Sequence, residues 1–141
     1  MTAKNSFLKI AATSLALAFA GTAAHCEPAA QPAAHEVRGV SDFNVTLDTN
    51  KPVLVEFYAT WCGYCKLMKP LVYEAAQQRQ GQMAVAQVNV EGPGNAGLAR
   101  TFTDRGAVPA FVIFEHGKPV ARYDGAFTSR AGFNRFLNSA P

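Results

Sequence analysis

The stretch Val53-Leu-Val-Glu-Phe-Tyr-Ala-Thr-Trp-Cys-Gly-Tyr-Cys-Lys-Leu-Met-Lys-Pro70 decides the fold. Residues 53–58 form a nearly continuous hydrophobic run that includes β-branched and aromatic side chains, which is typical of a strand buried on both faces of an α/β sheet. From Cys62 onward, apolar residues such as Leu67 and Leu71 recur at helical spacing. The sequence therefore predicts a buried strand that leads directly into a helix, with two cysteines at the junction.

The two cysteines, Cys62 and Cys65, lie where this helix is expected to begin. A helix N-terminus has unpaired backbone N–H groups and a positive dipole end, and such sites lower a thiol pKa from about 8.5 to roughly 3.5 to 7.5. Cys62 is therefore the predicted attacking sulfur. The two-residue spacing puts both side chains on one helical turn, which makes Cys65 the predicted resolving thiol. The pair alone leaves half of a zinc site and a purely structural disulfide open as alternatives.

Further elements of an α/β domain are predicted on both sides of this stretch. A short helix with Phe43 and Leu47, capped by Ser41 or Asp42, precedes the strand. Loops rich in Gly and Pro separate the elements that follow it. These are a strand over 83–90, a short helix over 96–103, a strand over 110–114, a hairpin turn at 117–119, a strand over 120–123, and a final helix capped by Thr128 or Ser129.

The first 24 residues have the layout of a secretory signal peptide. Two lysines precede an apolar stretch over 10–21, and small residues follow up to Ala24, after which we expect cleavage. The stretch is shorter than the roughly 18 apolar residues that suggest a membrane span, so we expect no stable span. An uncleaved signal that anchors the protein to the membrane is the alternative.

Residues 25–38 are rich in Pro and Ala and are predicted to form a tether, so the domain is expected to cover residues 39–141. With 141 residues, of which 49% are hydrophobic, the chain fits one compact domain. Two of its 13 basic residues lie in the predicted signal peptide, which leaves 11 against 10 acidic residues. No Lys/Arg cluster remains, so nucleic acid is not an expected partner. Cys26, in the tether, is expected to be dispensable.

The stretch 53–70 resembles the active-site strand and helix of the thioredoxin family. The resemblance continues with Val108-Pro109 before a buried strand, which is similar to the family's cis-proline strand, and with Asp124-Gly125-Ala126, which is similar to its glycine turn. It covers roughly residues 39–139. The resemblance implies a thioredoxin fold, in which helices flank a central mixed β-sheet in a single α/β domain.

The resemblance also implies a substrate-binding surface around the cysteines. Pro109 is expected to be cis and to face the cysteine pair, while the backbone of Val108 pairs with an extended substrate segment. Trp61 is expected to shield the site, although a lone tryptophan is often a core residue. The other residues implied in substrate binding are Gly63, Tyr64 and Gly125.

Glu56 matches the family's buried acidic position beneath the cysteines. Burial there raises a carboxyl pKa, so that the group can exchange a proton with Cys65 through water. The family's usual residue is Asp, and Gln87 occupies a place where many thioredoxins have a lysine. The alternative for Glu56 is a strand carboxylate that reaches solvent or a lysine.

The sequence thus predicts an exported, periplasmic thiol:disulfide oxidoreductase that uses its Cys62–Cys65 disulfide and no metal or other cofactor. Expected partners are the thiols and disulfides of exported proteins, apocytochrome c among the possible clients, and a redox partner that regenerates the pair. We expect a monomer. Tyr64 resembles the Cys-Gly-Tyr-Cys of periplasmic isomerases, so reduction, oxidation and isomerisation stay open. The alternative function is a non-catalytic binding module or a metal-binding protein, for example one that binds copper, on the same fold.

Overall fold

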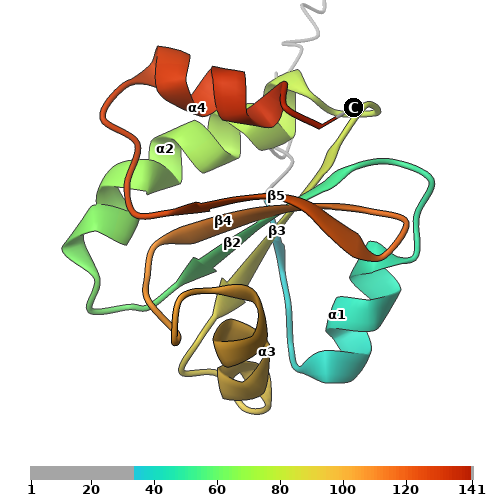
Figure 1. Ribbon diagram of the computed structural model, residues 1–141, viewed down its shortest axis with the longest axis vertical. Coiled ribbons are helices and arrows are strands. Elements are labelled where there is room, and N and C mark those ends of the chain that lie inside the picture. Colours follow the sequence, from blue (N-terminus) through green and yellow to red (C-terminus); the bar gives the residue numbers. More distant parts are fainter. Residues whose placement is uncertain (1–33, 141) are drawn as a thin grey trace, which may run out of the picture.

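A computed structural model describes residues 34–140 and shows a five-stranded sheet between two layers of helices (Figure 1). The predicted signal peptide, Cys26 and most of the predicted tether lie outside the described residues. In chain order the elements are β1 (His35–Glu36), α1 (Val40–Leu47), β2 (Val53–Tyr58), α2 (Gly63–Gln78), β3 (Ala84–Asn89), α3 (Asn95–Phe102), β4 (Ala110–Glu115), β5 (Lys118–Asp124) and α4 (Arg130–Leu137).

The sheet is mixed, as predicted, and β2 lies at its centre. The strand order is β1-β3-β2-β4-β5, in which β2 runs parallel to β3 and antiparallel to β4. The register puts Glu56 opposite Gln87 on one side and opposite Phe111 on the other. The one charged residue of the central strand therefore has a polar neighbour in β3 and an apolar neighbour in β4.

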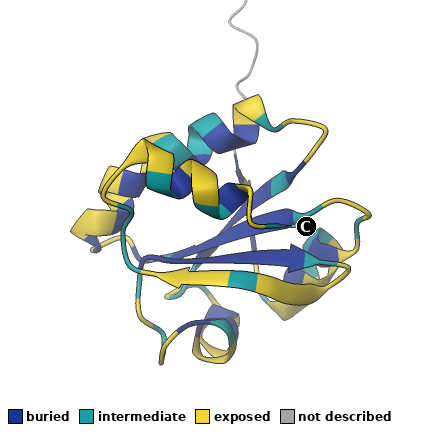
Figure 2. Cartoon of the chain, turned by 45° about the horizontal axis from the view of Figure 1, so that its top comes forward, coloured by how far each residue is buried: buried dark blue, intermediate teal, exposed yellow. Residues whose placement is uncertain are grey.

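Two hydrophobic cores cover the two faces of the sheet. Because side chains alternate along a strand, Val53, Val55 and Phe57 of β2 pack with residues of α1 and α3, whereas Leu54 packs with residues of α2 and α4. Figure 2 shows the central strands as buried and β5 as largely exposed at the edge of the sheet. Both faces of β2 are thus covered, which explains its nearly continuous apolar sequence.

The sheet begins earlier in the chain than predicted. His35 and Glu36 form β1 and pair in parallel with Ala86 and Gln87 of β3. Both residues lie within the predicted tether, four and three residues before the predicted start of the domain at residue 39. Two residues are too few to show the alternation of a strand, and the Pro/Ala-rich composition before them obscured the boundary.

Helix α1 also begins earlier than predicted. Its N-cap is Gly39, and neither Ser41 nor Asp42 caps it with a side chain. The Asp42 carboxylate instead accepts a hydrogen bond of 2.7 Å from the backbone N–H of Arg38. At α4 the expected cap is present, because the Ser129 hydroxyl accepts a hydrogen bond from the Gly132 N–H at 3.1 Å. Within residues 34–140, none of the helices has the length and apolar character needed to cross a membrane.

Candidate active site

The two cysteines lie at the junction of β2 and α2 and form a disulfide, with 5.3 Å between their Cα atoms. Cys62 is the N-cap of α2, and its Sγ accepts a hydrogen bond from the Cys65 backbone N–H at 3.1 Å. Both residues are only 5% exposed. A sulfur at this position faces the unpaired N–H groups and the positive dipole end of the helix, which favour a thiolate once the disulfide is reduced.

The segment around Pro109 lies beside the cysteine pair. Val108 packs against the small cluster that contains Cys62 and Cys65. The Val108–Pro109 peptide bond is cis, and Pro109 is buried. The Pro109 carbonyl accepts a hydrogen bond from the Gly125 N–H at 2.8 Å. The fold therefore places Val108 against the disulfide and links Gly125 to the adjacent Pro109.

An exposed apolar surface surrounds the start of α2. Trp61 is 68% exposed and Tyr64 is 67% exposed, so the tryptophan is not the core residue of the alternative interpretation. Gly63, between the cysteines, is also exposed. Leu67 is 71% exposed, although its helical spacing had placed it with the core residues. These side chains give the site a substantial apolar surface for a partner.

Glu56 lies beneath the cysteines and is only 1% exposed. Its Oε2 accepts a hydrogen bond of 2.7 Å from Gln87 Nε2. Burial raises the pKa of the Glu56 carboxyl to about 7, against the lowering effect of the hydrogen bond from Gln87. The alternative of a carboxylate that reaches solvent is therefore wrong for this residue. A group with this pKa exists in both protonation states near neutral pH and is suited to accept and release a proton.

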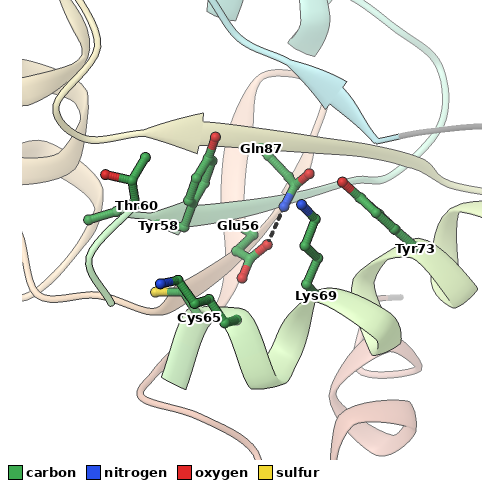
Figure 3. A pocket seen from close by; sticks show the side chains of 9 residues that line it. Glu56, Tyr58, Thr60, Cys65, Lys69, Tyr73 and Gln87 are labelled. Atoms are coloured by element: carbon green, nitrogen blue, oxygen red, sulfur yellow. Dashed lines mark hydrogen bonds between the residues drawn. The ribbon is translucent and has the colours of Figure 1, made fainter. Parts of the chain in front are cut away.

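A cavity of about 280 Å³ is lined by both Glu56 and Cys65 (Figure 3). Cys65 contributes to its lining from α2 and Glu56 from β2. Its other lining residues are Tyr58, Ala59, Thr60, Lys66, Lys69, Tyr73 and Gln87. Because Lys66 and Lys69 are exposed, the cavity links the buried carboxyl with the protein surface. It is large enough for several water molecules, so water can occupy the space that Cys65 and Glu56 both line.

Sequence reasoning missed Lys69 and Tyr73 as members of the site. They follow Cys65 by four and eight residues on α2, and this spacing puts all three side chains on one face of the helix. The spacing is visible in the sequence, but spacing alone does not show that this face of the helix borders a cavity.

No metal centre is found in the part of the chain that the structure describes, where no three His, Cys, Asp or Glu side chains gather in a group that suits an ion.

The sequence model of the family Thioredoxin matches residues 34–139. The chain is 39% identical over 94 residues to a thioredoxin of Mycolicibacterium smegmatis, a match that covers 67% of this chain and 82% of that protein. It is 42% identical over 91 residues to the bifunctional thioredoxin reductase/thioredoxin of Mycobacterium leprae, covering 64% of this chain but only 19% of that protein. A similar match to a thioredoxin of Mycobacterium tuberculosis covers 66% of the relative.

Two solved thioredoxin structures are similar to this fold. A mutant thioredoxin from Halobacterium salinarum is 28% identical, with a TM-score of 0.66 over 79% of this chain and 94% of that chain. The thioredoxin of Malassezia sympodialis is 24% identical, with a TM-score of 0.65 over 77% and 93% of the two chains, and shows similarity of fold alone.

Proposed function

The chain belongs to the thioredoxin family, and we propose that it exchanges disulfides with exported proteins through Cys62 and Cys65. Family membership and the disulfide of this pair support protein-disulfide oxidoreductase activity. The observation that carries the proposal is the position of Cys62 as the N-cap of α2, where its sulfur accepts a backbone hydrogen bond beside Val108 and Pro109.

In the reductive direction, the reaction has two steps. The Cys62 thiolate attacks a substrate disulfide, forms a mixed disulfide and releases one substrate thiolate. Cys65 then gives its proton to the Glu56 carboxylate and attacks the Cys62 sulfur, which displaces the second substrate thiolate. Two electrons pass from the cysteine pair to the substrate, and the Cys62–Cys65 disulfide forms. Oxidation of a substrate dithiol is the reverse sequence.

Substrate recognition is proposed for the surface beside the disulfide. The backbone of Val108 would pair with an extended substrate segment, and the exposed rings of Trp61 and Tyr64 offer it apolar contact area. Gly63, between the cysteines, has no side chain, so its backbone is accessible to a substrate. Gly125 supports Pro109 through its hydrogen bond. This arrangement suits protein substrates of many different sequences, because most of the proposed contacts involve the substrate backbone and apolar groups.

We propose that the protein is a periplasmic monomer and that a separate redox partner regenerates it. The support for this proposal is the signal-like pattern of residues 1–24 and the oxidising conditions under which exported disulfides persist. Cell fractionation with mass spectrometry of the N-terminus tests this part. A cytoplasmic protein with an intact N-terminus would contradict it.

Turnover of a disulfide-bonded test protein, such as insulin with dithiothreitol as reductant, tests the activity itself. We expect the purified protein to accelerate reduction and the variant Cys62→Ala to lose this effect. A binding module would not accelerate the reaction, so an inactive wild type that is folded would contradict the proposed function.

A further inference from the structure

We propose that Lys69 is a positioning residue for the resolving step, because its ammonium group extends into the cavity shared by Glu56 and Cys65 and keeps the Glu56 carboxyl ready to accept the Cys65 proton. The inference rests on the proposed function and adds a residue to it. Lys69 does not take the proton in this account. It acts through the charge that it brings to the Glu56 side of the cavity.

The helix geometry directs Lys69 into this cavity. Lys69 follows Cys65 by one helical turn, and the cavity is lined by both residues and by Tyr73 one turn further on. In Figure 3 the Lys69 side chain rises from α2 toward the hydrogen-bonded pair of Glu56 and Gln87. Its Nζ lies 5.4 Å from the centre of the Tyr73 ring, a cation–π contact that holds the ammonium at the cavity rim.

The Glu56 carboxylate has one oxygen available for a proton. Oε2 accepts the hydrogen bond from Gln87, whereas Oε1 is the only buried side-chain nitrogen or oxygen atom without a hydrogen-bond partner among residues 34–140. A proton from Cys65 can therefore bind at Oε1 without breaking the contact to Gln87. An unpaired buried oxygen also makes the ionised carboxylate costly, so a nearby cation is needed to keep it ionised.

The charges around Glu56 act in opposite directions. Burial is the main effect and raises the Glu56 pKa to about 7, the carboxylate of Glu36 raises it as well, and Lys69 lowers it. Glu36 lies on β1 opposite Gln87, and both of its oxygens are 3.1 Å from the Tyr58 hydroxyl that donates to them. The neighbouring strands β3 and β4 present the neutral Gln87 and the apolar Phe111 to Glu56. The titratable and charged groups that face Glu56 come from three other elements: Glu36 from β1, Tyr58 from β2, and Cys65, Lys66, Lys69 and Tyr73 from α2.

This balance controls the second step of the reaction. Cys65 transfers its proton to Glu56, the Cys65 thiolate forms a bond to the Cys62 sulfur, and the bond between Cys62 and the substrate sulfur breaks to release a substrate thiolate. Only the ionised form of Glu56 can accept the proton. Loss of the Lys69 charge would leave more of Glu56 protonated at neutral pH. The resolving step would therefore be slower at neutral pH, and its pH–rate profile would shift to higher pH.

The test is a titration of the Glu56 carboxyl by carbon-13 NMR in the oxidised full chain, with Glu56→Gln to assign its resonance. We expect Lys69→Met to raise the midpoint by roughly 0.5 to 1 pH unit and Lys69→Arg to stay close to the wild type. Glu36→Gln, which retains an acceptor for Tyr58, should lower the midpoint. Lys66→Met is the charge-matched control, because Lys66 also lines the cavity. Lys69, in contrast, contacts the Tyr73 ring and lowers the Glu56 pKa, so Lys66→Met should move the midpoint less than half as far.

The same variants are then compared in the rate of release of a thiol from a preformed mixed disulfide on Cys62, measured between pH 5 and pH 9. The pH profile of the release rate for Lys69→Met should shift to higher pH by about as much as the titration midpoint of Glu56 in that variant. An unchanged midpoint, equal shifts for Lys66→Met and Lys69→Met, or a shifted midpoint with an unchanged rate profile would each overturn the role of Lys69. A wild type without disulfide exchange would instead overturn the proposed function, and the titration distinguishes the two failures because it requires no turnover.

Discussion

Glu56 and Gln87 lie opposite each other on β2 and β3, and the carboxamide of Gln87 donates a 2.7 Å hydrogen bond to the Glu56 carboxylate. Both side chains are buried. The carboxylate thus has a neutral donor as its direct partner, and the cation that lowers its pKa, Lys69, comes from α2. This arrangement leaves burial as the dominant influence on the acidity of Glu56.

Glu56→Gln is predicted to change the pH dependence of stability. The folded protein binds the Glu56 proton more tightly than the unfolded chain, because the pKa is raised from 4.5 to about 7. The free energy of unfolding therefore falls as the pH rises from about 4.5 to about 7, by up to about 3 kcal/mol, and this loss is complete above pH 7.

Urea unfolding of the oxidised wild type and of Glu56→Gln across pH 4 to 8 measures this effect. The variant should gain stability relative to the wild type through the same pH range and show a constant difference above it. A difference that does not depend on pH would show that Glu56 has an ordinary pKa.

Gln87→Lys is predicted to lower the pKa of Glu56, because it replaces a neutral donor with a cation at hydrogen-bond distance. The control Gln87→Met has a similar length but no donor, so it should raise the pKa further. Carboxyl NMR titration of the oxidised protein checks both. Shifts of the same sign in the two variants would contradict the assigned role of the hydrogen bond.

Gly125→Ala is predicted to destabilise the protein by at least about 1 kcal/mol. Gly125 has a φ of +107°, which side chains rarely adopt, and its N–H holds the Pro109 carbonyl. The control is Gly97→Ala, in open space within α3, which should stabilise by roughly 0.5 to 1 kcal/mol. Urea unfolding measures the free energy of unfolding of both variants. Equal changes in the two would show that the positive φ of Gly125 does not make an alanine there destabilising.

Tyr64→Pro is predicted to make the Cys62–Cys65 pair more reducing, by at least about 30 mV, which is a tenfold change in the equilibrium with glutathione. Proline restrains the backbone between the cysteines and changes the hydrogen bonding near the Cys62 thiolate. Tyr64 lies in the first turn of α2 and is 67% exposed, so the helix and the core should tolerate proline.

Equilibration with glutathione measures this potential, and Tyr64→Ala separates the loss of the ring from the effect of proline. A potential that is unchanged or less negative in Tyr64→Pro would contradict the role given to residue 64.

Much of the fold was predictable because its signals are local. The buried run 53–58, the helical spacing after Cys62 and the Ser129 cap each specify an element within a few residues. The strand at 35–36 was not predictable, because its identity depends on pairing with β3 rather than on its own two residues. Gly39 as the N-cap of α1 was missed for a similar reason, since capping rules favour a side-chain oxygen.

The site also contains residues that the local sequence predicts and residues that only the tertiary structure shows. Cys62 and Cys65 were evident from their spacing, and Glu56 stood out as a charge in an apolar strand. The contribution of Lys69 and Glu36 to the Glu56 environment depends on how α2 and β1 lie over β2, which is tertiary information. The exposure of Leu67 also required the structure, because helical spacing alone does not show where the buried face ends.

The asymmetry between the two cysteines is the central claim, and trapping of mixed disulfides tests it most directly. Cys65→Ser and Cys62→Ser are expressed in the native host, thiols are quenched with acid and alkylated, and covalent adducts are identified on non-reducing gels and by mass spectrometry. Cys65→Ser should accumulate adducts with client proteins through Cys62, because the resolving thiol is missing. Cys62→Ser should accumulate none. Equal trapping by both variants, or trapping through Cys65 alone, would contradict the assignment of Cys62 as the attacking sulfur.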